Sequence, residues 1–383
     1  MKRELYYPKA WAKPCVCTHR NTTIMPASSR DKPPSRGSPL PLGHRYACLE
    51  REPFDDGWAQ EKGAPTAPPT EVRWEEAHSA LATNRSPDIG FDRSLNPYRG
   101  CEHGCAYCYA RPMHAWLDLS PGLDFERIII ARRHLAERLR DELNRPSYRP
   151  APIALGTATD AWQPVERKLG LTRAVLEVLA EARHPWSAVT KGSGILRDLD
   201  LIAPMAASGL CEVYVTLTTL DAELARRLEP RAASPRRRLE VIAALARAGV
   251  PVGVSLAPQI PFLTEDMEAV LAAAAEAGAT SAFMSILRLP HELEAIFDDW
   301  LQRHVPERRE RILARLRELH GGKLDGPFGE RFRGRGPWAA LLAQRFTIAR
   351  RRAGLERPLP PLVTHLFRPP AKRAGEPVQQ ALF

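Results

Sequence analysis

Short apolar runs alternate with amphipathic segments along most of this chain, and that alternation restricts its fold more than any other feature. The amphipathic segments have the apolar spacing of helices, whereas the runs have the length and composition of strands. Strands that alternate with helices in this way form βαβ units with a parallel sheet. The predicted strands span residues 91–95, 152–158, 186–190, 212–219, 252–257 and 281–287, and the predicted helices between them span residues 171–183, 199–207, 235–248 and 265–277.

Six such units predict an α/β fold of the partial (β/α)6 barrel type, because a closed barrel of this kind has eight strands. Gly209, Gly249 and Gly278 follow three of the predicted helices and are typical helix stop signals. The predicted parts are a loosely structured extension at 1–80, the barrel at 86–290, a helical region at 291–356 and a flexible, proline-containing tail at 357–383.

The overall composition limits the compartment and the partners. No apolar run approaches the roughly 20 residues that span a bilayer, and the first residues lack the apolar stretch of a signal peptide. We therefore expect a soluble, cytoplasmic protein. The formal net charge of +10 slightly favours a polyanionic partner such as nucleic acid, although codon bias toward Arg, Ala and Pro explains it as well.

Three of the seven cysteines crowd into one short segment. Cys101, Cys105 and Cys108 have the spacing C-x3-C-x2-C, and Gly100 and Gly104 allow a tight loop around a bound group. Three thiolates from one loop can hold a 4Fe-4S cluster and leave one iron open.

Zinc is the competing metal. A structural zinc site requires four ligands, and His103 or His114 is the candidate for the fourth. Zinc ligands usually come as two C-x2-C pairs, however, and the chain has no second pair. Cys15 and Cys17 form a C-x-C pair that lacks obvious partners, so we do not expect it to bind metal.

The segment from Asn96 to His114, NPYRGCEHGCAYCYARPMH, resembles the radical SAM superfamily, and within it the subgroup related to spore photoproduct lyase, also described as DNA-repair-photolyase-like. The resemblance extends over residues 86–350. It implies a 4Fe-4S cluster whose open iron binds S-adenosylmethionine, reduction by an external flavodoxin- or ferredoxin-like donor, and a 5′-deoxyadenosyl radical that abstracts hydrogen from the substrate. It also implies that Tyr107 lies against the adenine.

In barrels of this type the chemistry lies at the C-terminal ends of the strands. By the same resemblance, Thr159 and Asp160 bind the methionine amino group, and Lys191 faces the methionine carboxylate. Asp160 as a helix cap and Lys191 as a solvated side chain are the competing interpretations. The predicted cofactor-binding residues are Tyr107, Thr159, Asp160, Lys191, Thr216, Thr218 and Ser255.

One position departs from the lyase pattern. The lyase has a hydrogen-donating Cys where this chain has Thr157, so thymine-dimer lyase activity is doubtful. Cys211 is expected at the wrong end of the barrel to replace that Cys. Tyr98, Tyr107 and Tyr109 are candidate radical relays, and Arg231 is a candidate anion contact.

The chain closes on a Q-x-x-L-F sequence formed by Gln379, Leu382 and Phe383. It resembles the peptide with which bacterial repair proteins bind the replication sliding clamp. Two other functions stay open at this point. One is a zinc-dependent, non-catalytic nucleic-acid-binding protein, and the other is a clamp-tethered adaptor that has lost catalysis.

Overall fold

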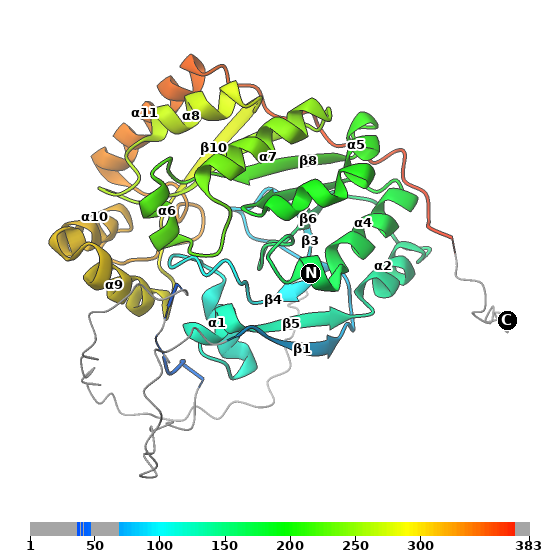
Figure 1. The fold of residues 1–383 in the computed structure, drawn as a ribbon, viewed down its shortest axis with the longest axis horizontal. Helices are drawn as coiled ribbons and strands as arrows, with labels where there is room; N and C mark the ends of the chain where they lie inside the picture. The colour runs from blue at the N-terminus through cyan, green and yellow to red at the C-terminus, as the bar shows by residue number, and fades with distance from the viewer. Residues whose placement is uncertain (1–36, 39, 41, 47–68, 372–383) are drawn as a thin grey trace, which may run out of the picture.

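The computed structural model describes residues 37–38, 40, 42–46 and 69–371 (Figure 1). The C-x-C pair at residues 15–17 and the clamp-like peptide at residues 379–383 lie outside this part of the chain. Within it, no helix is both long enough and apolar enough to cross a membrane.

A seven-stranded sheet forms the body of the molecule, in the order β10-β9-β8-β7-β6-β3-β2. Six neighbouring strands are parallel and β2 is antiparallel, so the predicted six-stranded parallel arrangement is confirmed. The sheet stays open, because β10 and β2 are its two edges. The strands are β2 (Ala82–Thr83), β3 (Arg93–Leu95), β6 (Ile153–Leu155), β7 (Trp186–Thr190), β8 (Cys211–Thr216), β9 (Val252–Gln259) and β10 (Ser281–Ile286).

Helices join these strands and flank the sheet (Figure 1). They are α3 (Glu166–Leu169), α4 (Leu171–Glu181), α5 (Leu199–Ala207), α6 (Ala222–Leu228), α7 (Pro235–Arg247) and α8 (Met267–Glu276), with a 3-10 helix at Ser193–Asp198. The predicted helices therefore fall where expected, to within two residues at each end. Gly209, Gly249 and Gly278 have φ values of +67°, +74° and +103°, as expected of helix stops.

The two faces of the sheet differ in chemistry. Val213, Val215 and Val254 are buried in the apolar core. On the opposite face, Val189 and Phe283 are 43% and 36% exposed, although both lie within strands. Side chains alternate between the two faces along a strand. The face that carries Val189 and Phe283 is therefore the open face of the partial barrel.

A second, three-stranded sheet lies in the order β1-β5-β4, and its first strand lies in the described end of the stretch 1–80 that was predicted to be loosely structured. β1 (Glu71–Glu76) pairs in parallel with β5 (Ile128–Arg133), which pairs antiparallel with β4 (Tyr98–Arg99). β1 carries several charged, half-exposed side chains because it is an edge strand. Its sequence therefore lacks the apolar signal of the central strands. Helices α1 (Leu123–Arg127) and α2 (Leu135–Leu143) flank β5.

Three charged helices follow the barrel, as predicted: α9 (Leu293–His304), α10 (Arg309–Leu319) and α11 (Gly336–Arg352). Residues 357–371, which were predicted to belong to a flexible tail, lie against the barrel. Val363 N donates to Gly209 O at 3.0 Å, and Arg368 N donates to Ala182 O at 3.0 Å. Phe367 contacts Tyr148 and His184. Gly209 and Ala182 precede β8 and β7, so this segment runs along the N-terminal ends of the strands.

Candidate active site

The cysteine loop begins directly after β4 and depends on two glycines. Gly100 has φ +82°, and a Cβ there would lie 2.8 Å from Phe125 O. Gly104 has φ +67°, and a Cβ there would lie 2.7 Å from a Glu126 carboxylate oxygen. Both positions therefore exclude other side chains, which explains the two glycines in the motif. Cys101 N donates to Phe125 O at 2.9 Å and fixes the start of the loop.

The three cysteines share one neighbourhood. Cys101 and Cys105 are buried, Cys108 is partly buried, and all three are free thiols. Burial raises the pKa of Cys101, and the charges of Asp160, Cys105 and Cys108 raise it further. Such thiols lose their protons when iron takes the proton's place. The donor set, three soft sulfurs in one glycine-bounded loop, therefore fits an iron–sulfur cluster.

The zinc interpretation does not fit this geometry. Within the described residues, no three His, Cys, Asp or Glu side chains are grouped closely enough to hold a single metal ion. His114 Nε2 contacts Ile128 O at 3.1 Å, and burial lowers its pKa to about 4. His103 Nδ1 lies 3.4 Å from Asp160 Oδ2. Each cluster thiolate binds a different iron, so cluster ligands stand further apart than the ligands of one ion.

A buried ion pair supports one side of the cysteine loop. Arg111 and Glu126 are fully buried and form a salt bridge. Arg111 also donates to the backbone of the loop, to Cys105 O at 2.8 Å and Gly104 O at 3.1 Å. The guanidinium thus holds the loop backbone while the carboxylate compensates its charge.

A second buried ion pair lies on the α6–α7 side of the loop. Glu229 forms a salt bridge with Arg238, and both side chains are at most 2% exposed. Glu229 also accepts hydrogen bonds from the Tyr107 hydroxyl and from Thr218 Oγ1. Burial raises the pKa of Glu229, but Arg238 and Lys191 more than offset this effect, so the net pKa is lowered and the group is ionised.

Lys191 extends from the end of β7 toward this network. Its Nζ lies 5.7 Å from the centre of the Tyr107 ring. Burial alone would lower the pKa of Lys191, but the neighbouring Cys105 and Glu229 outweigh burial and raise it. The ammonium is therefore charged and is available to an anion at the barrel mouth.

Thr159 and Asp160 brace the cysteine loop from the β6 side. Thr159 Oγ1 donates to Gly100 O at 2.6 Å. The Asp160 carboxylate accepts from Thr190 Oγ1 at 2.8 Å, from Lys191 N at 2.7 Å and from Trp162 N at 2.9 Å. The Trp162 contact is a local turn bond, but the others tie β6 to the end of β7. Asp160 is thus more than a helix cap.

Thr216 and Ser255 are adjacent in register on β8 and β9. Both are buried, and no described group hydrogen-bonds to Ser255 Oγ. Lys191 follows Thr190, which pairs with Val215, so Lys191 lies beside Thr216. The structure therefore brings Lys191, Thr216 and Ser255 side by side at the C-terminal ends of three neighbouring strands.

Tyr109 crosses the barrel mouth directly after the last cysteine. Its hydroxyl donates to Thr157 O at the end of β6. Its ring lies 5.7 Å from the guanidinium of Arg288, which follows β10. Tyr109 is 46% exposed, so it offers an aromatic face to solvent beside the cysteine loop.

Three other residues named from the sequence lie away from the proposed cofactor site or are already paired. Tyr98 is fully buried and donates to Glu166, which makes it part of the core rather than of the mouth. Arg231 pairs with Glu102 at 3.0 Å, so it is not a free anion contact. Cys211 begins β8, at the end of the barrel opposite the cysteine loop, as expected.

Sequence reasoning missed several residues around the loop. Arg238 lies nine positions after Glu229, a spacing that no local pattern links. Gln163 Nε2 donates to Gly100 O at 3.2 Å, and its Oε1 accepts from Glu102 N at 2.8 Å. The only available signal was the Glu229-Pro230-Arg231 turn that follows α6. Leu228, the last residue of α6, accepts from Ala106 N at 2.9 Å.

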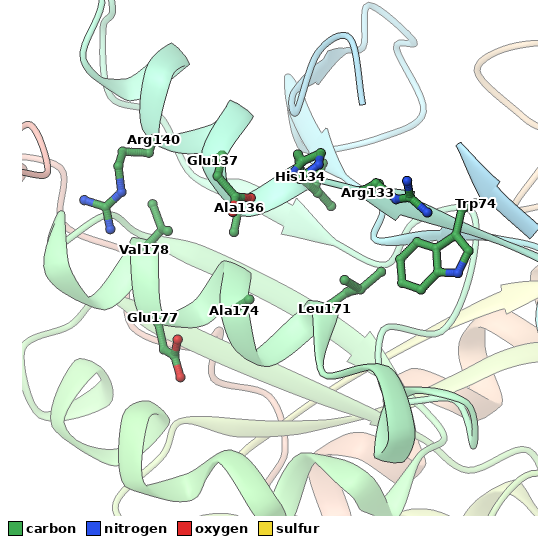
Figure 2. A pocket seen from close by; sticks show the side chains of 11 residues that line it. Trp74, Arg133, His134, Ala136, Glu137, Arg140, Leu171, Ala174, Glu177 and Val178 are labelled. Carbon is green, nitrogen blue, oxygen red and sulfur yellow. The ribbon is translucent and has the colours of Figure 1, made fainter. Parts of the chain in front are cut away.

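A surface groove of about 340 Å³ lies elsewhere, between β1, the end of β5, α2 and α4 (Figure 2). Trp74, Arg133 and His134 line one part of it, and Glu177 and Val178 of α4 line another. None of its lining residues belongs to the cysteine loop or to the predicted cofactor-binding set.

The sequence is similar to known proteins along most of its length. Residues 95–275 match the family model of the radical SAM superfamily. An uncharacterized protein of Mycobacterium bovis is 37% identical over 320 residues, which are 82% of this chain and 88% of that protein. An uncharacterized protein of Methanocaldococcus jannaschii is 26% identical over 223 residues, covering 57% of this chain and 78% of the relative.

Among solved structures, spore photoproduct lyase has a similar fold. The lyase complexed with dinucleoside spore photoproduct aligns with a TM-score of 0.50 and 14% identity, covering 76% of this chain and 85% of the lyase. A mutant of the lyase with bound AdoMet and the dinucleoside aligns with a TM-score of 0.50 over 73% and 79% of the two chains. At this identity the likeness concerns the fold alone.

Proposed function

The chain belongs to the radical SAM superfamily, and from this premise we propose that it modifies nucleic acid at the mouth of its partial barrel. Enzymes of this superfamily use a 4Fe-4S cluster and S-adenosylmethionine, and they need an external electron donor. When bound, the reduced cluster would donate an electron to S-adenosylmethionine. The cofactor would then split to give a 5′-deoxyadenosyl radical, which abstracts hydrogen from a substrate. The chain itself binds, orients and shields these groups.

We assign the cluster to Cys101, Cys105 and Cys108. The cysteine-to-alanine variants of this set should each lose iron and sulfide, because a cluster held by two thiolates exposes two irons. Cys211→Ala is the matched control, since Cys211 lies at the opposite end of the barrel. Iron and sulfide at the wild-type level in any of the three variants would contradict the assignment.

We assign the cofactor site to the residues at the strand ends. Lys191 is the cation for the methionine carboxylate, and the Tyr107 ring beside it is the surface for the adenine. Thr216 and Ser255 offer hydroxyls in the same layer, and Ser255 Oγ has no partner among the described residues. A buried hydroxyl without a partner is costly, so a ligand group that binds it gains affinity.

The observation that carries the nucleic-acid proposal is an arginine–aromatic cluster beside Tyr109. Arg288 lies over the rings of Tyr109 and Phe332, at 5.7 and 5.4 Å. Arg331 lies over Phe328 and Phe332, at 4.3 and 5.1 Å. Phe332 O accepts from Ile286 N, which fixes this segment to the end of β10. Both arginines also pair with carboxylates, Arg288 with Asp325 at 3.2 Å and Arg331 with Asp88 at 2.9 Å. The aromatic faces beside them therefore carry the proposal, because such faces suit stacked bases, and the arginines add cation–π contacts.

Two of these aromatic rings are accessible, since Tyr109 is 46% and Phe328 67% exposed. The exposed Lys323, Arg333 and Arg335 extend the positive charge along residues 320–336. Thr157 cannot easily donate a hydrogen atom, so the proposed reaction differs from dimer cleavage by the lyase.

Fluorescence anisotropy with a labelled single-stranded DNA oligonucleotide tests the proposal. Arg288→Ala should weaken binding by about 1–3 kcal/mol and reduce the salt dependence by one phosphate contact. Arg345→Ala is the control, because Arg345 is also paired with a carboxylate, Glu268 of α8, but lies on α11 and makes no described contact with the aromatic cluster. Equal affinities of Arg288→Ala and wild type, or salt-independent binding, would exclude this surface.

The carboxyl-terminal peptide gives a further proposal, that Gln379, Leu382 and Phe383 bind the replication sliding clamp. The motif supplies a glutamine for hydrogen bonds and a Leu-Phe pair for an apolar pocket. Ala371, the last described residue, is hydrogen-bonded to Glu181 just before β7, at the end of the barrel opposite the cysteines. A clamp bound there would leave the mouth open.

Titration of a labelled peptide of residues 372–383 with purified clamp tests the motif. We expect a dissociation constant near micromolar, about −8 kcal/mol, and its loss in Phe383→Ala. Absence of saturable binding at high micromolar clamp would end the tethering proposal. We also propose that a flavodoxin- or ferredoxin-like protein donates the electron and that the protein acts in the cytoplasm.

A further inference from the structure

Glu229 is the centre of a buried charge network that no part of the proposed reaction uses directly. Its carboxylate accepts from the Tyr107 hydroxyl, from Thr218 Oγ1 at 3.2 Å and from Arg238. The side chain is 0% exposed, and that of Arg238 is 2% exposed. A buried ion pair of this kind contributes little to stability, because desolvation offsets much of its attraction.

The same turn holds the cysteine loop by its backbone. Leu228 O accepts from Ala106 N at 2.9 Å, and Arg231 N donates to His103 O at 3.2 Å. Arg238 reaches back to Ala233 O at 2.7 Å and to Thr216 O at 3.1 Å. Glu229 therefore stands on a rigid support directly beside the loop that carries Cys105.

Two cations and one anion lie together beside the loop. Lys191 Nζ lies 5.7 Å from the centre of the Tyr107 ring, and the Tyr107 hydroxyl donates to Glu229. Arg238 forms a salt bridge with the same carboxylate. Removal of the Glu229 charge alone would leave two buried cations uncompensated beside the loop.

We infer that Glu229 is a positioning residue that lowers the reduction potential of the cluster and holds Tyr107 for the cofactor. Reduction adds one negative charge to the cluster, and a fixed carboxylate nearby disfavours that charge. The potential of such clusters depends on net charge, hydrogen bonding and burial, and Glu229 acts through the first of these. A low potential delivers a stronger reductant to the bound sulfonium.

Potentiometric titration of the reconstituted full-length protein, followed by electron paramagnetic resonance without S-adenosylmethionine, tests this inference. In Glu229→Gln we expect the midpoint potential to rise by about 59 mV, equivalent to a tenfold change in the one-electron equilibrium. Glu229→Asp keeps the charge, so it should restore most of the wild-type potential.

Glu142→Gln is the matched control. Glu142 is another buried carboxylate, 7% exposed, but it lies on α2 and accepts from Ala80 N at 2.8 Å rather than from the cysteine loop or its supports. Its variant should keep the wild-type potential. An unchanged potential in Glu229→Gln, or equal shifts in both variants, would overturn the inference.

If Glu229→Gln does not retain its cluster, the midpoint potential of Lys191→Met provides a second test of the inference. Loss of this cation leaves more of the Glu229 charge uncompensated, so the potential should fall. A potential that rises or stays constant in Lys191→Met would contradict the inference without any use of enzyme activity.

Discussion

At the proposed cofactor site, Lys191 and Asp160 should act in different ways, although both follow barrel strands. Lys191 Nζ lies 5.7 Å from the centre of the Tyr107 ring, so Lys191→Met should remove the proposed direct contact with the methionine carboxylate. Asp160 already accepts several protein hydrogen bonds, so Asp160→Ala acts by releasing Thr190 and the Lys191 backbone.

We expect both variants to keep their cluster and to bind S-adenosylmethionine about tenfold to a hundredfold more weakly, roughly 1.5–3 kcal/mol. Isothermal titration calorimetry of the reconstituted variants measures this change. Binding isotherms equal to wild type for both variants would show that the cofactor lies elsewhere.

The buried His184 should make the folded protein less stable as the pH falls. Burial lowers its pKa to about 4, while its ring contacts the Tyr148 hydroxyl at 2.7 Å and Pro185 O at 3.0 Å. The folded protein therefore disfavours the protonated ring, so its contribution to stability is complete above pH 6.5 and is lost as the pH falls toward 4. Each pKa unit corresponds to about 1.4 kcal/mol.

His184→Gln should narrow the difference in melting temperature between pH 7 and pH 5, because the glutamine does not titrate there. His114 and His304 also have a pKa of about 4 and remain in the variant, so part of the dependence persists. An identical pH profile of wild type and variant would contradict the assignment to His184.

At the scale of elements, the three-stranded sheet supports the cysteine loop. β4 ends two residues before Cys101, and Ile129 of β5 is fully buried with Tyr98, Ala131 and Val165. Ile129→Ala should cost about 2–5 kcal/mol and lower the fraction of chains that retain a cluster. Melting temperature and iron content measure the two effects.

Leu341→Ala is the control, since Leu341 is 53% exposed on α11 and the change should leave both readouts near wild type. Amide hydrogen exchange gives an independent check on β1. Residues 71–76 should be protected like residues 128–133, and rapid exchange of 71–76 would contradict the pairing with β5.

At the scale of the whole molecule, residues 357–371 act as a strap along the N-terminal ends of the strands. Truncation after Ala371 keeps all described contacts of the strap and is the control for a shorter chain. Truncation after Glu356 removes the packing of Phe367 on Tyr148 and His184, so the melting temperature should fall. Equal melting temperatures of the two truncated chains would mean that the strap does not stabilise the barrel.

The strap and the mouth lie at opposite ends of the barrel. The proposed chemistry lies at the C-terminal ends of the strands, beside the cysteine loop and Lys191. The strap ends at Ala371 near the opposite ends of the strands, so we expect clamp binding, if it occurs through residues 379–383, to leave the mouth accessible. This separation allows each to be removed by mutation without loss of the other.

The sequence by itself determined the parallel core and the cluster loop. Short apolar strands and helices closed by Gly209, Gly249 and Gly278 are local patterns, so residue spacing alone identified them. The cysteine loop is also local, because its three thiols and two glycines lie within nine residues.

Only the tertiary structure decided which side chains surround that loop. β1 joins β5 across more than 50 residues, and its edge position removes the apolar pattern that would reveal it. Glu229 meets Tyr107 across 122 positions, and Arg288 meets Tyr109 from the last strand. Such contacts depend on the pairing and register of the strands, which bring the strand ends together and which no local spacing encodes.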